Sequence, residues 1–133
     1  MKILLVLTAA IEVGAGLAFL CCPSAAAELL FGSPLDAPAA AALARLAGAA
    51  LLALGVANWL AHYDPHSRAA RGVVTGMTLY NLGAALVLTV AGTQLRPVGL
   101  ALWPAVALHA ALTVWCITSL LRKTAQEVKE QQP

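Results

Sequence analysis

Four apolar segments, each long enough to cross a bilayer, constrain the fold of this 133-residue chain more than any other feature. A hydrocarbon core of about 30 Å requires about 20 apolar residues in a helix. Hydrophobic residues make up 61% of the chain and charged residues 11%, unlike the balance of soluble domains. The sequence therefore predicts an all-α fold, a four-helix transmembrane bundle in a single domain over residues 1–133. Its spans run about Ile3 to Cys22, Ala39 to Ala61, Gly72 to Ala91 and Val98 to Leu121.

The first apolar segment has features of a signal peptide. Lys2 precedes the apolar run, and Ala25 to Ala27 supply small residues for cleavage. Glu12 interrupts the run, however, and the segment is long enough to span. We expect the first span to be retained.

Charge placement predicts the orientation, because Lys and Arg accumulate in short cytoplasmic loops. We therefore expect a multi-pass protein of the bacterial inner (plasma) membrane with both termini in the cytoplasm. The basic residues at one set of span ends are Lys2, Arg68, Arg71, Arg122 and Lys123, whereas the opposite loops carry Glu28, Asp36 and Arg96.

Local signals refine this bundle. Ser24 is a predicted N-cap and Gly32 a predicted stop for a short outer interfacial helix. Pro104 lies inside the fourth predicted span, so a kink near Leu100 to Trp103 is expected. After Leu121 the chain is polar and predicts a short cytoplasmic C-terminal tail that is helical and frays at its Gln-Gln-Pro end.

Polar residues lie near the middle of three spans. At 1.5 Å per residue, Glu12 and Asn81 lie roughly 14 Å from the cytoplasmic side, and His109 is about halfway along its span. Arg45 lies in the outer third of the second span and can either snorkel outward or reach toward Glu12. We predict one intramembrane polar cluster of Glu12, Arg45, Asn81 and His109. Tyr80, on a different face from Asn81, is expected to serve in packing.

Two interpretations of this cluster remain open. In the first, Glu12 and Arg45 form a buried ion pair while Asn81 and His109 hold the helices in register, since polar residues commonly join membrane helices. In the second, Glu12 belongs to a ligand or proton site, because a buried carboxylate without a nearby cation tends to take up a proton. The position of Arg45 decides between the two.

The stretch AAIEVG at residues 9–14 is similar to the first-span glutamate region of small multidrug resistance transporters, which are also short four-helix proteins. In that family the glutamate is the shared proton and cation site, and the resemblance implies that role for Glu12 alone. Arg45 departs from the family pattern.

A wider resemblance is to small four-span bacterial membrane proteins of the DoxX-like kind. It rests on Ala15 to Leu17, on the segment Pro23 to Gly32, and on ARLAG at residues 44–48. This resemblance implies a four-helix bundle and no defined activity.

Other motifs argue against several kinds of chemistry. Cys21 and Cys22 are adjacent, an arrangement that can capture copper(I), but such residues more often act as small hydrophobes. His62 and His66 lie in a loop, too far from His109 to share a haem. Hydrolase and nucleotide-binding motifs are not recognisable. We expect no catalytic residues, no metal site, no cofactor and no nucleic-acid partner.

Three functions are compatible with these features. The first is a non-enzymatic role, in which the bundle binds a hydrophobic or lipid-like molecule or serves as an accessory subunit of a membrane complex. The second is a small proton-coupled transporter using Glu12, and the third is a membrane enzyme acting on a lipid or quinone. Expected partners are membrane lipid and either a larger complex or a second copy, for which the small-residue pair Gly72 and Gly76 offers a contact.

Overall fold

A computed structural model describes residues 1–95 and 98–130, with side chains described as far as residue 122. Within these ranges the regular secondary structure consists of helices, with no strands. The five helices are α1 (Lys2–Cys21), α2 (Pro23–Phe31), α3 (Pro38–Ala61), α4 (Arg68–Gln94) and α5 (Leu102–Glu130).

Four of these helices are long and apolar enough to cross a membrane, as the sequence predicts. They are α1, α3, α4 and the Leu102–Arg122 part of α5. Helices α1 and α3 each begin one residue before the corresponding predicted span. Helix α4, which forms the third predicted span, begins earlier than the apolar pattern indicates because Ser67 caps it. The Ser67 hydroxyl oxygen accepts a hydrogen bond from the amide of Ala70 at 3.1 Å.

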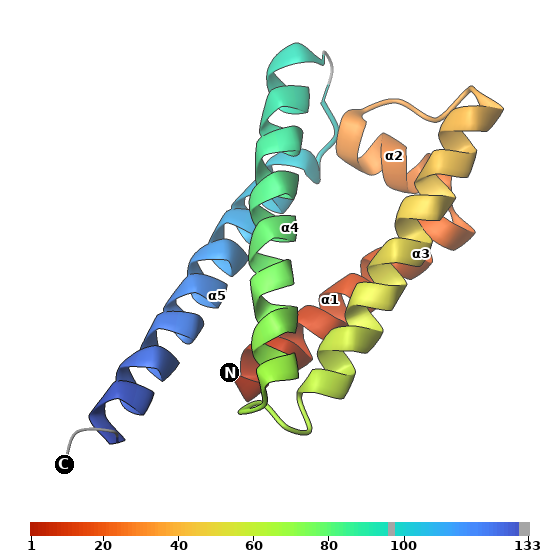
Figure 1. Ribbon diagram of the computed structural model, residues 1–133. Helices are drawn as coiled ribbons and strands as arrows, with labels where there is room; N and C mark the ends of the chain where they lie inside the picture. The colour runs from red at the N-terminus through yellow and green to blue at the C-terminus, as the bar shows by residue number, and fades with distance from the viewer. Residues whose placement is uncertain (96–97, 131–133) are drawn as a thin grey trace.

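The long helices form two pairs, α1 with α3 and α4 with α5 (Figure 1). The start of α1, the end of α5 and the turn between α3 and α4 lie at one end of the molecule, which we call the terminal end. Helix α2 and the connection between α4 and α5 lie at the other end, the α2 end. The pairs diverge toward the α2 end, so the bundle is open there.

Two glycines allow the close crossing of α1 and α3. A Cβ atom added to Gly16 would lie 2.8 Å from the carbonyl oxygen of Gly48, and one added to Gly48 would lie equally close to the carbonyl oxygen of Gly16. Such contacts are typical of membrane helices, which associate by packing rather than by exclusion of water. Further toward the terminal end, Gly55 packs against Val13 in the same way.

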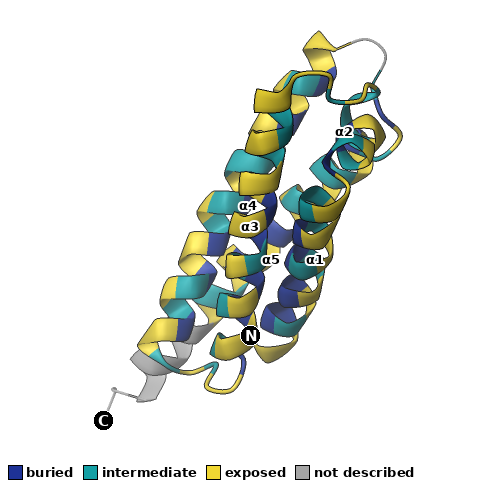
Figure 2. Cartoon of the chain, turned by 90° about the vertical axis from the view of Figure 1, so that its right-hand side faces the viewer, coloured by how far each residue is buried: buried dark blue, intermediate teal, exposed yellow. Residues whose placement is uncertain are grey.

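The two pairs meet in an apolar core near the terminal end. Buried positions, dark blue in Figure 2, lie where the helices face one another. The members of this core come from α1, α4 and α5: Leu4, Leu5, Val74, Met77, Leu112 and Cys116. The core holds the two pairs together at the terminal end.

Helix α2 is held against the connection that leads into α5. Gly99 and Ala101 donate backbone hydrogen bonds to the carbonyl oxygens of Leu30 and Leu29, at 3.1 and 2.9 Å. These carbonyls belong to the last turn of α2, where carbonyl oxygens have no amide partner within the helix. A segment far along the chain therefore completes this short helix.

The predicted stop of the short helix is confirmed, whereas its predicted N-cap is wrong. Gly32 ends α2 with a positive φ of 78°, a conformation that favours glycine. Ser24 lies inside the helix, because Pro23 occupies the first helical position, where its fixed φ suits the start of a helix. The Ser24 hydroxyl instead accepts a hydrogen bond from the amide of Leu35 at 3.0 Å.

The kink predicted at Pro104 is also wrong. Since α5 begins at Leu102, Pro104 is its third residue. The first four amides of a helix have no partner within the helix, so the missing amide of proline breaks no hydrogen bond there. The predicted frayed residues 131–133 lie outside the described part of the chain.

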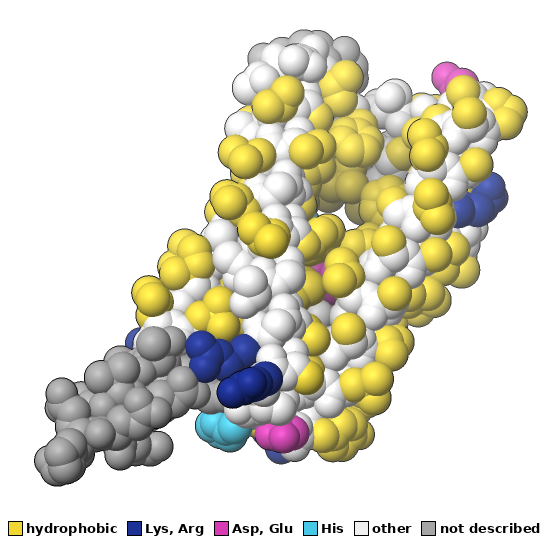
Figure 3. Space-filling model, viewed as in Figure 1, with side chains coloured by type: hydrophobic (Ala, Val, Ile, Leu, Met, Phe, Trp, Pro, Cys, Tyr) yellow, Lys and Arg dark blue, Asp and Glu magenta, His cyan; other side chains and the backbone are white. Residues whose placement is uncertain are grey.

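Basic and apolar side chains occupy different parts of the surface. On the face shown in Figure 3, Lys and Arg side chains gather at the start of α4, near the terminal end, and a further basic group lies on α3. Hydrophobic side chains cover much of the remaining surface. Gly72 and Gly76 make no packing contact within the described chain, since a Cβ atom added to either would meet nothing within 4 Å. This pair therefore does not hold the monomer together.

Candidate ligand-binding site

A hydrogen bond between side chains joins α4 to α5 in the middle of the bundle. His109 Nδ1 lies 2.8 Å from Asn81 Oδ1. Asn81 is completely buried, and its Nδ2 donates to the carbonyl oxygen of Met77 at 2.7 Å. The Asn81 amide is therefore oriented by its own helix, with its oxygen turned toward His109. These two residues of the predicted cluster are therefore in direct contact.

Tyr80 connects this pair to the first helix. Its ring lies edge-on to the ring of His109, with 5.7 Å between the centroids. Tyr80 also packs against the apolar core to which α1 contributes Leu4 and Leu5. The sequence predicts only a packing role for this tyrosine; its position one residue before Asn81 was the available signal that it could belong to the site.

Glu12 is buried to the extent that only 1% of its surface is exposed. Its Oε1 atom has no hydrogen-bond partner within the described part of the chain. A charged carboxylate at membrane depth costs about 3 kcal/mol on insertion scales, and pairing lowers that cost. An unpaired oxygen here indicates a group available to a proton or a ligand.

Arg45 is not brought into the cluster. Its side chain is exposed on α3, and it makes no ion pair with the carboxylates of residues 1–95 and 98–122. A long, flexible side chain in the outer part of a span can place its charge outside the hydrocarbon, which is less costly than reaching inward. The predicted cluster thus consists of Glu12, Asn81 and His109, with Tyr80 added and Arg45 removed.

An apolar cavity of about 420 Å³ opens between the two helix pairs on the α2 side of this cluster. On the face in Figure 3 the surface is hollowed between α4 and α3. Tyr80 and His109 are the polar residues of its wall, and Glu12 is not part of that wall. The remaining lining is apolar and comes from all but the fifth helix: Phe19, Leu30, Phe31, Ala47, Ala50, Leu51, Leu54, Ala84, Val87 and Leu88.

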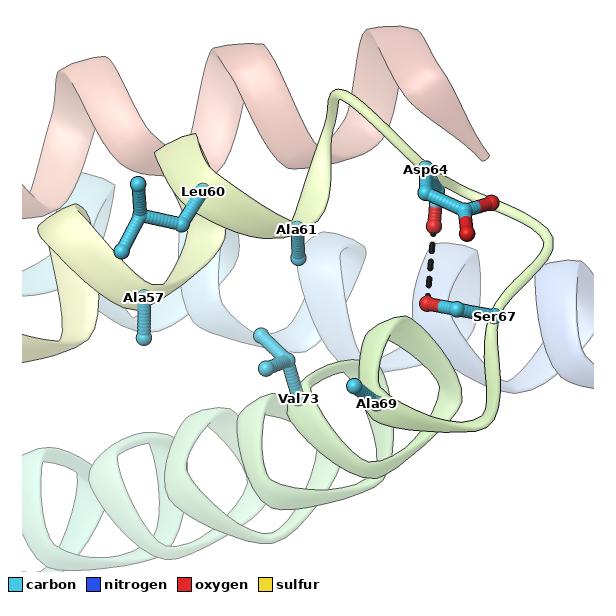
Figure 4. A pocket seen from close by; sticks show the side chains of 7 residues that line it. All are labelled: Ala57, Leu60, Ala61, Asp64, Ser67, Ala69 and Val73. Atoms are coloured by element: carbon cyan, nitrogen blue, oxygen red, sulfur yellow. Dashed lines mark hydrogen bonds between the residues drawn. The ribbon is translucent and has the colours of Figure 1, made fainter.

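A second hollow, of about 310 Å³, lies beside the turn between α3 and α4 (Figure 4). Its polar residues are Asp64 and Ser67, and the Ser67 hydroxyl donates to the Asp64 carbonyl oxygen at 2.9 Å. The Asp64 carboxylate accepts a hydrogen bond from the amide of His66 at 3.3 Å. These groups are used to form the turn and cap α4, so the hollow offers little to a ligand.

The cysteines and loop histidines do not add a metal centre. Cys21 and Cys22 are exposed and Cys116 is buried, all three as free thiols. His62 and Tyr63 stack at the terminal end, with ring centroids 4.0 Å apart. Within the described residues, no group of three His, Cys, Asp or Glu side chains could hold a metal ion.

Comparison with known proteins identifies no relative of this chain. No protein-family model, curated protein or solved structure matches the chain.

Proposed function

We propose that this chain is a multi-pass protein of the bacterial inner membrane that binds one hydrophobic or lipid-like molecule between its two helix pairs. Its role is non-enzymatic. The observation that carries the proposal is the cavity beside Tyr80 and His109. The cavity lies between helices that are long and apolar enough to cross a membrane, which supports a site within the bilayer.

The size and lining of the cavity support this role. Small-molecule sites have volumes of about 300 to 1,000 Å³, apolar walls and a few polar groups that fix orientation. The cavity meets each criterion, with about 420 Å³ of space and two polar residues at its wall. An apolar occupant would make dispersion contacts with these walls.

The proposed orientation has both termini in the cytoplasm and α2 at the outer interface. Basic residues at the terminal end support it, by the tendency of Lys and Arg to remain cytoplasmic. A cysteine-free variant carrying Ser67→Cys or Ser33→Cys tests it with a membrane-impermeant thiol reagent on intact cells. Ser33→Cys is expected to react and Ser67→Cys to stay unmodified; the reverse pattern contradicts the orientation.

Photolabelling tests the binding role directly. An alkane carrying a diazirine is bound to the protein in lipid nanodiscs, and labelled residues are identified by mass spectrometry. Label is expected to saturate and to concentrate on the lining residues of α3 and α4, which are Ala47, Ala50, Leu51, Leu54, Ala84, Val87 and Leu88. Labelling spread evenly over the lipid-facing surfaces, without saturation, would contradict the proposal.

Two alanines provide a matched pair of variants for this experiment. Ala84→Phe fills the cavity from α4 and is expected to abolish the saturable label. Ala107 is exposed on α5 and lies outside the cavity wall at a similar depth, so Ala107→Phe is expected to leave the label unchanged. Equal labelling of the two variants would place the bound alkane elsewhere.

Proton-coupled transport is a second candidate function, and the unpaired Oε1 of Glu12 favours it. Transport of this kind requires Glu12 to gain and lose a proton. Infrared spectroscopy of wild type and Glu12→Gln tests this step. A protonated-carboxyl band that is absent from Glu12→Gln and disappears as the pH rises is expected; a band that never appears, or never changes, argues against transport through Glu12.

A further inference from the structure

The hydrogen bonds around His109 determine what its ring can offer to the cavity. Because Asn81 Nδ2 donates to Met77, the oxygen of the same amide faces His109 and can only accept. The ring nitrogen Nδ1 must therefore carry the proton and donate. In a neutral imidazole only one nitrogen carries a proton, so Nε2 is left with a lone pair.

The surroundings keep the ring neutral and its Nε2 unpaired. A charged ring is costly in the hydrocarbon region, and the wall of the cavity around His109 is apolar apart from Tyr80. Nδ1 makes the one hydrogen bond of the ring to the described part of the chain, and the residue lines the cavity. An acceptor in an apolar space that has no donor lacks the hydrogen bond that would compensate for its removal from water.

We propose that the molecule bound in the cavity carries a hydroxyl group at one end, which donates a hydrogen bond to Nε2 of His109. The chemical class is an aliphatic or aromatic alcohol with an apolar body. The body lies along the apolar wall formed by Leu51, Leu54 and Leu88, and the hydroxyl lies at the end near Tyr80 and His109. This inference rests on the proposed binding function and specifies its ligand.

Competition between two isomers tests the inference. Tridecanol and dodecyl methyl ether contain the same atoms, but only the alcohol can donate a hydrogen bond. Each is used to displace the diazirine alkane from wild type and from His109→Phe in nanodiscs. The ratio of their displacement constants in wild type is divided by the ratio in the variant, which cancels their different partitioning into lipid.

In wild type the alcohol is expected to displace the label about tenfold better than the ether after this correction, since about 1.4 kcal/mol corresponds to a tenfold change. Equal displacement by the two isomers in wild type, after each is corrected for its measured partitioning into protein-free nanodiscs, would overturn the inference even if His109→Phe fails to fold. Saturable labelling by the alkane would still be present in that case, so the binding function would stand while the hydroxyl ligand would not.

Discussion

His109 Nδ1 lies 2.8 Å from Asn81 Oδ1, and this bond joins α4 to α5 at the point where the two helix pairs begin to separate. On one side of it lies the apolar core at the terminal end, and on the other lies the cavity. The bond therefore has a structural role and also orients the ring that lines the cavity.

Asn81→Leu is expected to destabilise the protein by about 1 to 2 kcal/mol, because it leaves the His109 Nδ1 proton unpaired in an apolar setting. Steric-trapping measurements of unfolding in bicelles give this free energy. Thr89→Val is the control, since the Thr89 hydroxyl is exposed and bonds only to its own helix. The double variant Asn81→Leu with His109→Phe should lose less than the sum of the single losses; additive losses would mean that the bond contributes nothing.

Gly16→Ala is expected to weaken the α1–α3 crossing, because the added Cβ would lie 2.8 Å from the Gly48 carbonyl oxygen. Overpacking of this kind costs about 1 to 3 kcal/mol. Gly14→Ala, two residues away on the same helix, meets nothing within 4 Å and should leave stability unchanged or slightly increased. Comparable free energies of unfolding for the two variants would be inconsistent with the close crossing.

Arg45→Gln is expected to change the free energy of unfolding by less than about 0.5 kcal/mol, as for other exposed positions. If Arg45 formed a buried ion pair with Glu12, the same substitution would cause a much larger loss of stability. Removing one partner from a buried pair costs about 3 to 5 kcal/mol. A loss of that size, measured by the same unfolding experiment, would restore the ion-pair interpretation.

Gly99→Ala is expected to detach α2 from the connection before α5, since a Cβ atom there would lie 2.2 Å from the Leu29 carbonyl oxygen. Hydrogen exchange at the amide of Ala101, which donates to that carbonyl, should become faster by an order of magnitude or more. Gly83→Ala, where nothing lies within 4 Å, serves as the control. Unchanged exchange at Ala101 in Gly99→Ala would show that α2 is not held by this contact.

The number of spanning helices and the meeting of Asn81 with His109 follow from sequence alone. Apolar length determines the spans, and a fixed rise per residue places polar groups at matching depth. The position of Arg45 does not follow, because a flexible side chain of its length can reach either inward or outward. The prediction at Pro104 failed because the start of α5 depends on contacts between Gly99, Ala101 and α2, which are far apart in sequence.

The cavity could not be predicted from the sequence either. It depends on how far two helix pairs diverge, which is set jointly by the Gly16–Gly48 crossing, the core at the terminal end and the attachment of α2. Tyr80 belongs to the wall for the same reason, since only the angle between the pairs exposes its ring to the open space.

Native mass spectrometry with tridecanol tests the binding of one molecule between the helix pairs most directly. The mass of the wild-type protein is expected to increase by one tridecanol in a saturable way, and Ala107→Phe should behave identically. Ala84→Phe, which fills the cavity, should show no saturable increase. Equal and saturable uptake by Ala84→Phe, or no saturable uptake by wild type, would contradict the account.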